Sequence, residues 1–110
     1  IDATDWSWCP IATDFDGDGW KDLFVSNGIV RRPNDLDYIN FMSNDSVQQN
    51  PDLSDFTLAD RMPAGEVSNF IFKNNGNLTF TDVTRNWGLY LPSFSNGAVA
   101  ADLDNDGDPD

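Results

Sequence analysis

Two short stretches of the chain carry aspartate at alternate positions, and both follow the pattern D-x-D-x-D-G-x-x-D. They span residues 14–22 and 102–110. Like charges held a few ångströms apart near a protein surface repel one another by energies on the kcal/mol scale. A hard divalent cation removes that repulsion, because its preferred ligands are carboxylate and carbonyl oxygens. The spacing of the aspartates therefore predicts a cation site in each loop.

Calcium is the ion that this spacing favours. Ca²⁺ takes about six to eight oxygen ligands, and a loop supplies them from alternate side chains, from one backbone carbonyl and from a later carboxylate. The glycine after the third aspartate permits the sharp turn that brings the later ligands back to the ion. The predicted ligands of the first loop are Asp14, Asp16, Asp18 and Asp22, with the backbone carbonyl of Trp20. Those of the second loop are Asp102, Asp104, Asp106 and Asp110, with the backbone carbonyl of Asp108.

Two other kinds of loop share parts of this pattern. An EF-hand shares the first half of the pattern but requires a glutamate at position 12 of its loop. That position is Val25 in the first loop, which excludes an EF-hand there. The remaining alternative is a pair of Asp/Gly-rich turns that bind nothing. A second copy in the same register favours the metal site over this alternative.

The composition limits the class of partner. The chain has 110 residues, and 19 acidic against 6 basic residues give it a net charge of −13. This charge argues against nucleic acid and anionic membrane surfaces as partners. No apolar run approaches the ~20 residues of a membrane span. With one cysteine and no histidine, the chain can form neither an internal disulfide nor a His/Cys zinc site.

The first loop is flanked by two short apolar runs, residues 8–13 and 23–25, which predict a strand on each side of a metal-binding turn. Residues 97–101 lead into the second loop in the same way. Ser7 and Ser95 occupy matching positions before the two loops, so the repeat extends beyond the aspartates. An internal repeat of this kind predicts blades or solenoid coils, each burying a face against the next.

Between the loops, apolar and aromatic runs at residues 69–73 and 78–83 flank an Asn-Gly turn at residues 74–77. This pattern predicts a β-hairpin. The alternation places one set of side chains on one face, where we expect them to pack against a neighbouring sheet. That set is Phe70, Phe72, Leu78 and Phe80.

Residues 31–68 differ from the rest of the chain and predict an insertion of two short helices and loops. Asn34 is the expected cap of a helix over residues 35–42, and a second helix is expected to begin at Pro51-Asp52 or Ser54. The number of residues from the first loop to the second is larger than the length of a four-stranded blade, which is about 40–45 residues. The excess is close to the length of this insertion.

The paired loops, each entered by a strand of small apolar residues, resemble FG-GAP/VCBS repeats. The resemblance extends to residues 23–28, to the hairpin at residues 74–84 and to residues 93–98. It implies blades of a β-propeller, as in the head of integrin α chains, with Ca²⁺ held between two strands of a blade. The chain as a whole resembles secreted bacterial relatives of cartilage acidic protein, which often carry an ASPIC/UnbV domain.

The predicted fold is therefore mainly β, a fragment of a β-propeller with antiparallel blades and a small helical and loop insertion. The expected segments are residues 1–30, with the first calcium loop, residues 31–68, the insertion, and residues 69–110, with the blade hairpin and the second loop. Because the chain stops on a predicted ligand, we expect it to be part of a longer protein that supplies the rest of the propeller.

The expected function is non-enzymatic. The resemblance implies an extracytoplasmic binding module with structural calcium and a protein or glycan ligand. The alternative is a fragment of a carbohydrate-active enzyme, such as a polysaccharide lyase, on a calcium-bearing propeller. Acidic residues of the insertion could provide the pair of carboxylates that cleavage of a glycosidic bond requires. Helix caps and solvated side chains explain most of these acids more simply.

Overall fold

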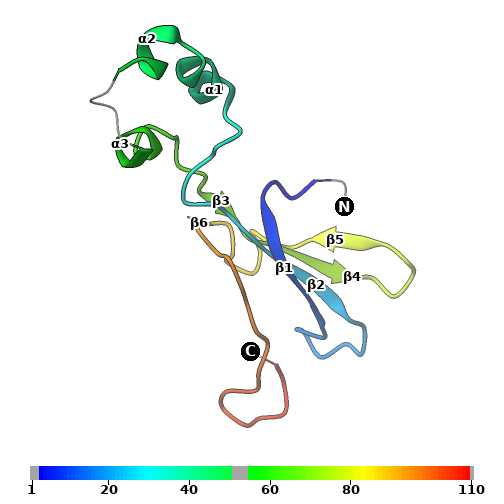
Figure 1. Cartoon of the computed structure of the whole chain (residues 1–110). Helices are drawn as coiled ribbons and strands as arrows, with labels where there is room; N and C mark the ends of the chain where they lie inside the picture. Colours follow the sequence, from blue (N-terminus) through cyan, green and yellow to red (C-terminus); the bar gives the residue numbers. More distant parts are fainter. Residues whose placement is uncertain (1–2, 51–54, 110) are drawn as a thin grey trace. The chain divides into compact units, whose positions relative to one another are not determined.

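The computed structural model describes residues 3–50 and 55–109 of the chain (Figure 1). The chain divides into two compact units. One consists of residues 1–28 together with residues 66–110, and the other of residues 29–65. The predicted insertion, residues 31–68, overlaps the second unit. Both acidic loops belong to the first unit.

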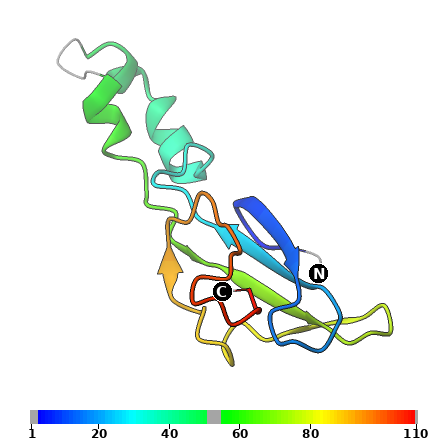
Figure 2. The same cartoon turned by 90° about the horizontal axis from the view of Figure 1, so that it is seen from below.

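The first unit contains a four-stranded antiparallel sheet with the strand order β1-β2-β4-β5 (Figure 1, Figure 2). Its strands are β1 (Ser7–Thr13), β2 (Asp22–Asn27), β4 (Phe70–Asn74) and β5 (Phe80–Asp82). Two further short strands, β3 (Val67–Ser68) and β6 (Pro92–Ser93), pair with each other. The predicted strands around the first loop and the predicted hairpin are confirmed. Propellers are built from four-stranded antiparallel blades, so the sheet is compatible with the predicted propeller fragment.

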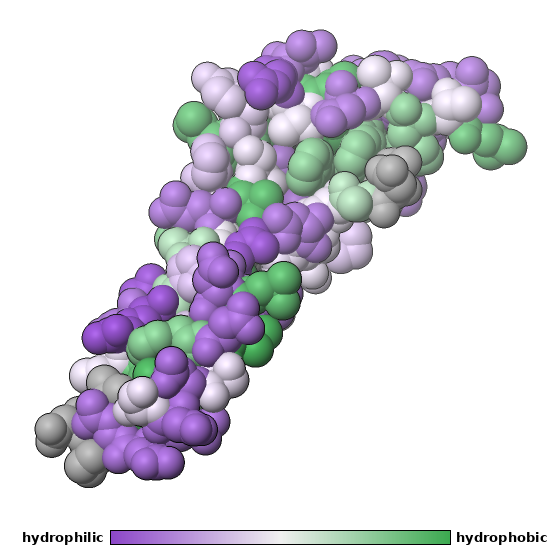
Figure 3. Space-filling view, turned by 90° about the horizontal axis from the view of Figure 1, so that it is seen from above, coloured by the Kyte–Doolittle hydropathy of each residue, from purple (hydrophilic) through white to green (hydrophobic). Residues whose placement is uncertain are grey.

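The hydrophobic core of the described residues is small. Its buried side chains come from β2, from β4 and from the position after β5: Val25, Ile71, Phe72 and Val83. Neighbouring residues of a strand point to opposite faces, so β4 buries a side chain on each side of the sheet. The rings of Phe70 and Phe72 stack with 5.9 Å between their centroids. A small core leaves many hydrophobic side chains at the surface. Figure 3 shows such residues among hydrophilic ones on the visible face.

Asn27, at the end of β2, is fully buried and has every polar group hydrogen-bonded. Its side-chain oxygen accepts from the hydroxyl of Ser7 at 2.8 Å, and its side-chain nitrogen donates to the carbonyl of Ser68 at 3.1 Å. Its backbone nitrogen donates to Asn69 Oδ1 at 2.9 Å, and its carbonyl accepts from the backbone nitrogen of Ser95 at 2.9 Å. Asn27 therefore joins four segments of the first unit, including both serines that match in the repeat.

The second unit is closed by the backbones of Ile29 and Gly65, which exchange two hydrogen bonds of 3.0 Å. Its described helices are α1 (Leu36–Met42), α2 (Asp45–Gln48) and α3 (Asp55–Ala59). The prediction of two helices missed α2, a single turn capped by Asn44, whose side chain accepts from Ser46 N at 3.0 Å. The expected starts of the second helix, at Pro51-Asp52 or Ser54, lie outside the described residues.

The predicted cap of the first helix is wrong by one residue. Asp35, not Asn34, precedes α1, and its carboxylate accepts from the backbone nitrogen of Tyr38 at 3.0 Å. Both residue types cap helices well, so propensity alone could not choose between them. Asp37 lies in the first turn, where its negative charge favours the positive end of the helix dipole.

Two details of the predicted strands are also wrong. Leu78 does not share the packed face of the hairpin, because the turn continues to Thr79, whose carbonyl accepts from Asn75 N at 3.0 Å. Leu78 is fully exposed in this turn with a φ of 66°. Residues 97–101 form no strand, because a strand requires a hydrogen-bonded neighbour and no described residue pairs with them.

Candidate metal centre

The first acidic loop connects β1 to β2 and is folded by hydrogen bonds from its own backbone. The two carboxylate oxygens of Asp14 accept from the backbone nitrogens of Asp18, at 3.1 Å, and Gly19, at 2.8 Å. Asp18 in turn accepts from the backbone nitrogen of Trp20 at 2.9 Å. Gly17 and Gly19 have φ values of 71° and 87°, a backbone region in which glycine meets no steric cost.

The second loop repeats this hydrogen-bond pattern at the equivalent positions. Asp102 accepts from the backbone nitrogens of Asp106, at 3.1 Å, and Gly107, at 3.0 Å. Asp106 accepts from the backbone nitrogen of Asp108 at 3.0 Å. The positive φ values recur as well, 99° at Gly107 and 64° at Asn105, where asparagine replaces glycine. The sequence repeat is therefore a repeat of backbone conformation.

Each loop brings three of its predicted ligands together. The carboxylates of Asp14, Asp16 and Asp18 offer oxygens that all lie within 4.8 Å of one another. The second loop forms the same group from Asp102, Asp104 and Asp106. Both groups present only carboxylate oxygens, which are the ligands of hard cations such as Ca²⁺. The donor set of each loop therefore fits the predicted ion.

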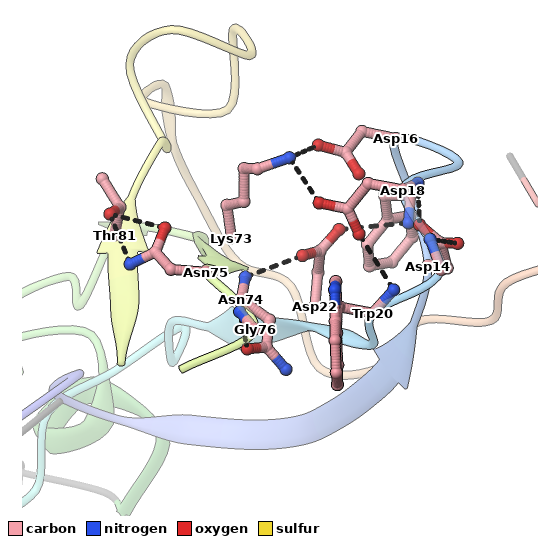
Figure 4. A network of polar contacts seen from close by, with 12 residues as sticks. Asp14, Asp16, Asp18, Trp20, Asp22, Lys73, Asn74, Asn75, Gly76 and Thr81 are labelled. Atoms are coloured by element: carbon pink, nitrogen blue, oxygen red, sulfur yellow. Dashed lines mark hydrogen bonds and ion pairs between the residues drawn. The ribbon is translucent and has the colours of Figure 1, made fainter. Parts of the chain in front are cut away.

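Asp22, the fourth predicted carboxylate ligand of the first loop, lies outside this group and is fully buried. One of its oxygens accepts from Phe15 N at 3.1 Å, and the other accepts from Asn74 N at 2.8 Å (Figure 4). Asn74 also donates through its side chain to the carbonyl of Lys21 at 3.0 Å. Asp22 thus fastens the first loop to the hairpin, and its role as a ligand stays a prediction.

Three predicted ligands remain: the carbonyls of Trp20 and Asp108, and the side chain of Asp110. The carbonyls of Trp20 and Asp108 belong to residues whose backbone nitrogens complete the two hydrogen-bond patterns. Asp110, the last predicted ligand of the second loop, lies outside the described residues. These three assignments stay predictions.

Lys73 is a residue of this site that the sequence did not reveal. It projects from β4 over the first loop, where its ammonium group donates to Asp16 and, at 2.8 Å, to Asp18 (Figure 4). Its hydrogen bond, followed by that of the Trp20 backbone, lowers the pKa of the Asp18 carboxyl. The hydrogen bonds to Asp16 and then Asp18 raise the pKa of the Lys73 ammonium. The first loop thus already holds one positive charge among its carboxylates.

The indole of Trp20 adds a further contact between the first loop and the hairpin. The ring lies so close to Gly76 that a side chain there would approach it to 2.9 Å. Gly76 also has a φ of 71°, so the turn needs glycine for both its conformation and its neighbour. Trp20 nevertheless remains 53% exposed.

The fold and the loops define the class of this protein as a mainly antiparallel β repeat module whose acidic loop connects adjacent strands. The model of the FG-GAP-like repeat family matches residues 52–110, just over half of the chain. The chain therefore belongs to the FG-GAP-like repeat family, whose repeats form propeller blades. The match includes the hairpin and the second loop. Neither the curated proteins nor the solved structures gave a match.

Membership of this family confirms the predicted resemblance to FG-GAP repeats and supports a propeller or adhesion-type module. FG-GAP repeats are usually parts of extracellular or surface domains and are typically non-catalytic. Within the part of the chain that the structure describes, no helix is long and apolar enough to cross a membrane. The expected relation to cartilage acidic protein and ASPIC/UnbV domains stays a prediction.

Proposed function

We propose that this chain is a calcium-binding repeat module of an extracytoplasmic β-propeller. The observation that carries the proposal is the agreement of the two loops. Each forms the same hydrogen bonds around its first aspartate, and each gathers three carboxylates whose oxygens lie within 4.8 Å of one another. Two separate segments have adopted one conformation that concentrates negative charge, which a bound cation would stabilise.

The donor chemistry favours Ca²⁺ over other common ions. Zinc sites prefer cysteine and histidine, whereas both loops offer only oxygen. Magnesium requires a near-ideal octahedron and keeps several of its waters, while calcium tolerates the irregular geometry of a carboxylate-rich loop. When bound, calcium would neutralise the clustered carboxylates and fix the conformation of each loop. Its role in this proposal is structural.

The proposed role of the module is to present a binding surface to a protein or a glycan outside the cell. The family supports an adhesion-type module, and the first loop connects two paired strands of the sheet. A protein used outside the cell meets abundant calcium, so weak sites of about 10⁻⁴–10⁻³ M would remain filled. The strongly negative chain would bind neutral or basic ligands more readily than anionic ones.

Calorimetric titration with CaCl₂ tests the calcium assignment. The unmodified chain is compared with Asp16→Ala, with Asp104→Ala and with Glu66→Ala, which removes one exposed negative charge outside both loops. We expect two sites, each lost with the substitution in its own loop and both retained in Glu66→Ala. Filling each site should raise the melting temperature. Absence of binding in samples whose circular dichroism shows a folded sheet would refute the proposal.

A further inference from the structure

The ammonium group of Lys73 lies where the candidate cation of the first loop would act. It contacts the carboxylates of both Asp16 and Asp18, two of the three that the loop gathers. A single positive charge shared by two carboxylates relieves much of the repulsion that an empty acidic loop would suffer. Lys73 therefore performs part of the electrostatic role that we propose for calcium.

The position of Lys73 is fixed by the sheet. In β4 it pairs with Thr81 of β5, and its neighbour Phe72 pairs with Leu23 of β2. The next residue, Asn74, donates its backbone nitrogen to the buried Asp22 of the loop. These contacts hold the start of the lysine side chain beside the loop, so that its charge can reach Asp16 and Asp18.

No such cation accompanies the second loop in the described part of the chain. Among the described residues, no lysine or arginine forms an ion pair with Asp102, Asp104 or Asp106. All three are exposed, and their described partners are backbone groups of the same loop. The two loops thus share a backbone conformation and differ in whether a positive side chain accompanies it.

We propose that Lys73 is a tethered counter-ion of the first loop, which stabilises the loop without metal and competes with the metal for Asp16 and Asp18. This inference rests on the proposed calcium function and extends it to the regulation of one site. Lys73 must leave the two carboxylates when a divalent cation occupies the loop. The first loop then binds calcium more weakly than its ligands alone would allow, and it keeps its conformation when calcium is scarce.

The test compares calcium binding with and without the lysine. Asp104→Ala removes the second site, so that calorimetry reports the first loop alone. In that background, Lys73→Met keeps a side chain of similar length and removes the charge. We expect calcium to bind about tenfold more tightly, because two exposed ion pairs and one repulsion between cations are lost.

Lys21→Met is the matched control. Lys21 lies in the same loop and is exposed, but its side chain makes no ion pair in the described part of the chain. It changes the net charge equally, so we expect its calcium affinity to change less than about twofold. Equal affinities of Lys73→Met and Asp104→Ala alone, or weaker binding in Lys73→Met, would overturn the proposal.

Thermal melts provide a second arm. In calcium-free buffer, Lys73→Met should melt about 3 °C below the unmodified chain, and saturating calcium should abolish or reverse the difference, because the variant binds calcium more tightly. A variant that still melts below the unmodified chain by the same amount in saturating calcium would show a general structural role for Lys73 and overturn the competition. Absence of calcium binding in both the unmodified chain and Asp104→Ala would overturn the proposed function, and the competition with it.

A third arm needs no substitution at Lys73. The side-chain NMR signals of Lys73 and Lys21 are followed while the unmodified chain is titrated with CaCl₂. The signals of Lys73 should shift in step with occupation of the first loop, while those of Lys21 stay in place. Unchanged Lys73 signals in a calcium-saturated sample would show that the lysine does not move and would refute the proposal.

Discussion

The two acidic loops have one backbone conformation but different surroundings. The first connects two paired strands and is attached to the hairpin through Asp22, Lys73 and Trp20. The second follows a segment that forms no strand, and its three gathered aspartates are exposed. Because the hydrogen bonds around Asp14 and Asp102 agree, the loop conformation does not depend on this attachment. The aspartates and the residues of positive φ specify it locally.

The comparison separates the residues that fold a loop from the residues that attach it to the sheet. Folding the loop needs only contacts within a few residues, and both copies accomplish it. Attaching the loop to the sheet needs residues from β2 and β4, which are far apart in the chain. Substitutions at attachment residues should therefore affect the whole first unit, whereas substitutions within a loop should have local effects.

The largest effect is expected from Asp22→Ala. This change removes a fully buried carboxylate and leaves the part-buried backbone nitrogens of Phe15 and Asn74 without their acceptor. Each unsatisfied buried donor costs about 1–3 kcal/mol, so we expect a loss of about 3 kcal/mol in the free energy of unfolding. Urea denaturation in calcium-free buffer measures the loss. Asp108→Ala, at an exposed position of the second loop, should change it by less than about 0.5 kcal/mol. Similar losses in the two variants would show that Asp22 does not attach the first loop to the hairpin.

A smaller effect is expected from Gly76→Ala. The added methyl group would meet the indole of Trp20 and would occupy a backbone region with positive φ. Together these effects should lower the free energy of unfolding by about 1–2 kcal/mol, as measured by urea denaturation. Gly97→Ala is the control, because a Cβ atom added at Gly97 would meet no neighbour within 4 Å and the residue has no positive φ. An equal loss in both variants would contradict the attachment of Trp20 to the hairpin.

The pH dependence of stability should reveal the ion pairs of Lys73, with an effect reduced by their exposure to solvent. The pKa of the Asp18 carboxyl is lowered in the folded chain. The ionised carboxyl therefore contributes its full share to the stability of the fold above the ordinary aspartate pKa of about 3.9. This contribution is lost as the pH falls through the lower pKa of the folded state. The pKa of Lys73 is raised, so its stabilisation is complete below about 10.4 and is lost as the pH rises through the higher folded value.

Melting temperatures in calcium-free buffer test this window. The difference between the unmodified chain and Lys73→Met should be constant between these limits and should disappear at both extremes of pH. A difference that does not depend on pH would mean that Lys73 stabilises the chain by packing alone.

The smallest effect is expected from exchanging the residues of positive φ between the loops. Gly17 and Asn105 occupy equivalent positions, with φ values of 71° and 64°. Asparagine tolerates this region, so Gly17→Asn should change the free energy of unfolding by less than about 0.5 kcal/mol. Gly17→Val, which cannot adopt the region without strain, should cost about 1–2 kcal/mol in the same urea titration. An equal cost for both variants would mean that the loops are not interchangeable.

The features that the sequence could predict depend on neighbouring residues. Short apolar runs on each side of a turn predicted β1, β2 and the hairpin, and the aspartate spacing predicted which carboxylates would gather. The hairpin followed from an Asn-Gly turn between two apolar runs. In each case the relevant residues lie within one short window, where strand period and turn chemistry decide the structure.

The features that could not be predicted depend on residues far apart in the chain. Lys73 is an ordinary strand residue until the pairing of β2 with β4 brings it to the first loop. Nothing in the sequence around Asn27 indicates that this residue joins four segments. The exposed turn position of Leu78 was missed for another reason, because leucine rarely adopts positive φ and the alternation pattern placed it in a strand.

The hydrogen bonds around Asn27 also protect a chemically labile site. An asparagine followed by glycine deamidates when the glycine nitrogen attacks the side-chain amide carbon, closes a succinimide ring and expels ammonia. In the folded chain the nitrogen of Gly28 donates to the carbonyl of Trp6 at 3.1 Å, and the amide of Asn27 is bonded at both ends. Asn96-Gly97 has the same sequence in an exposed segment. The ratio of the two deamidation rates, measured by mass spectrometry, would therefore report how often the centre of the first unit opens.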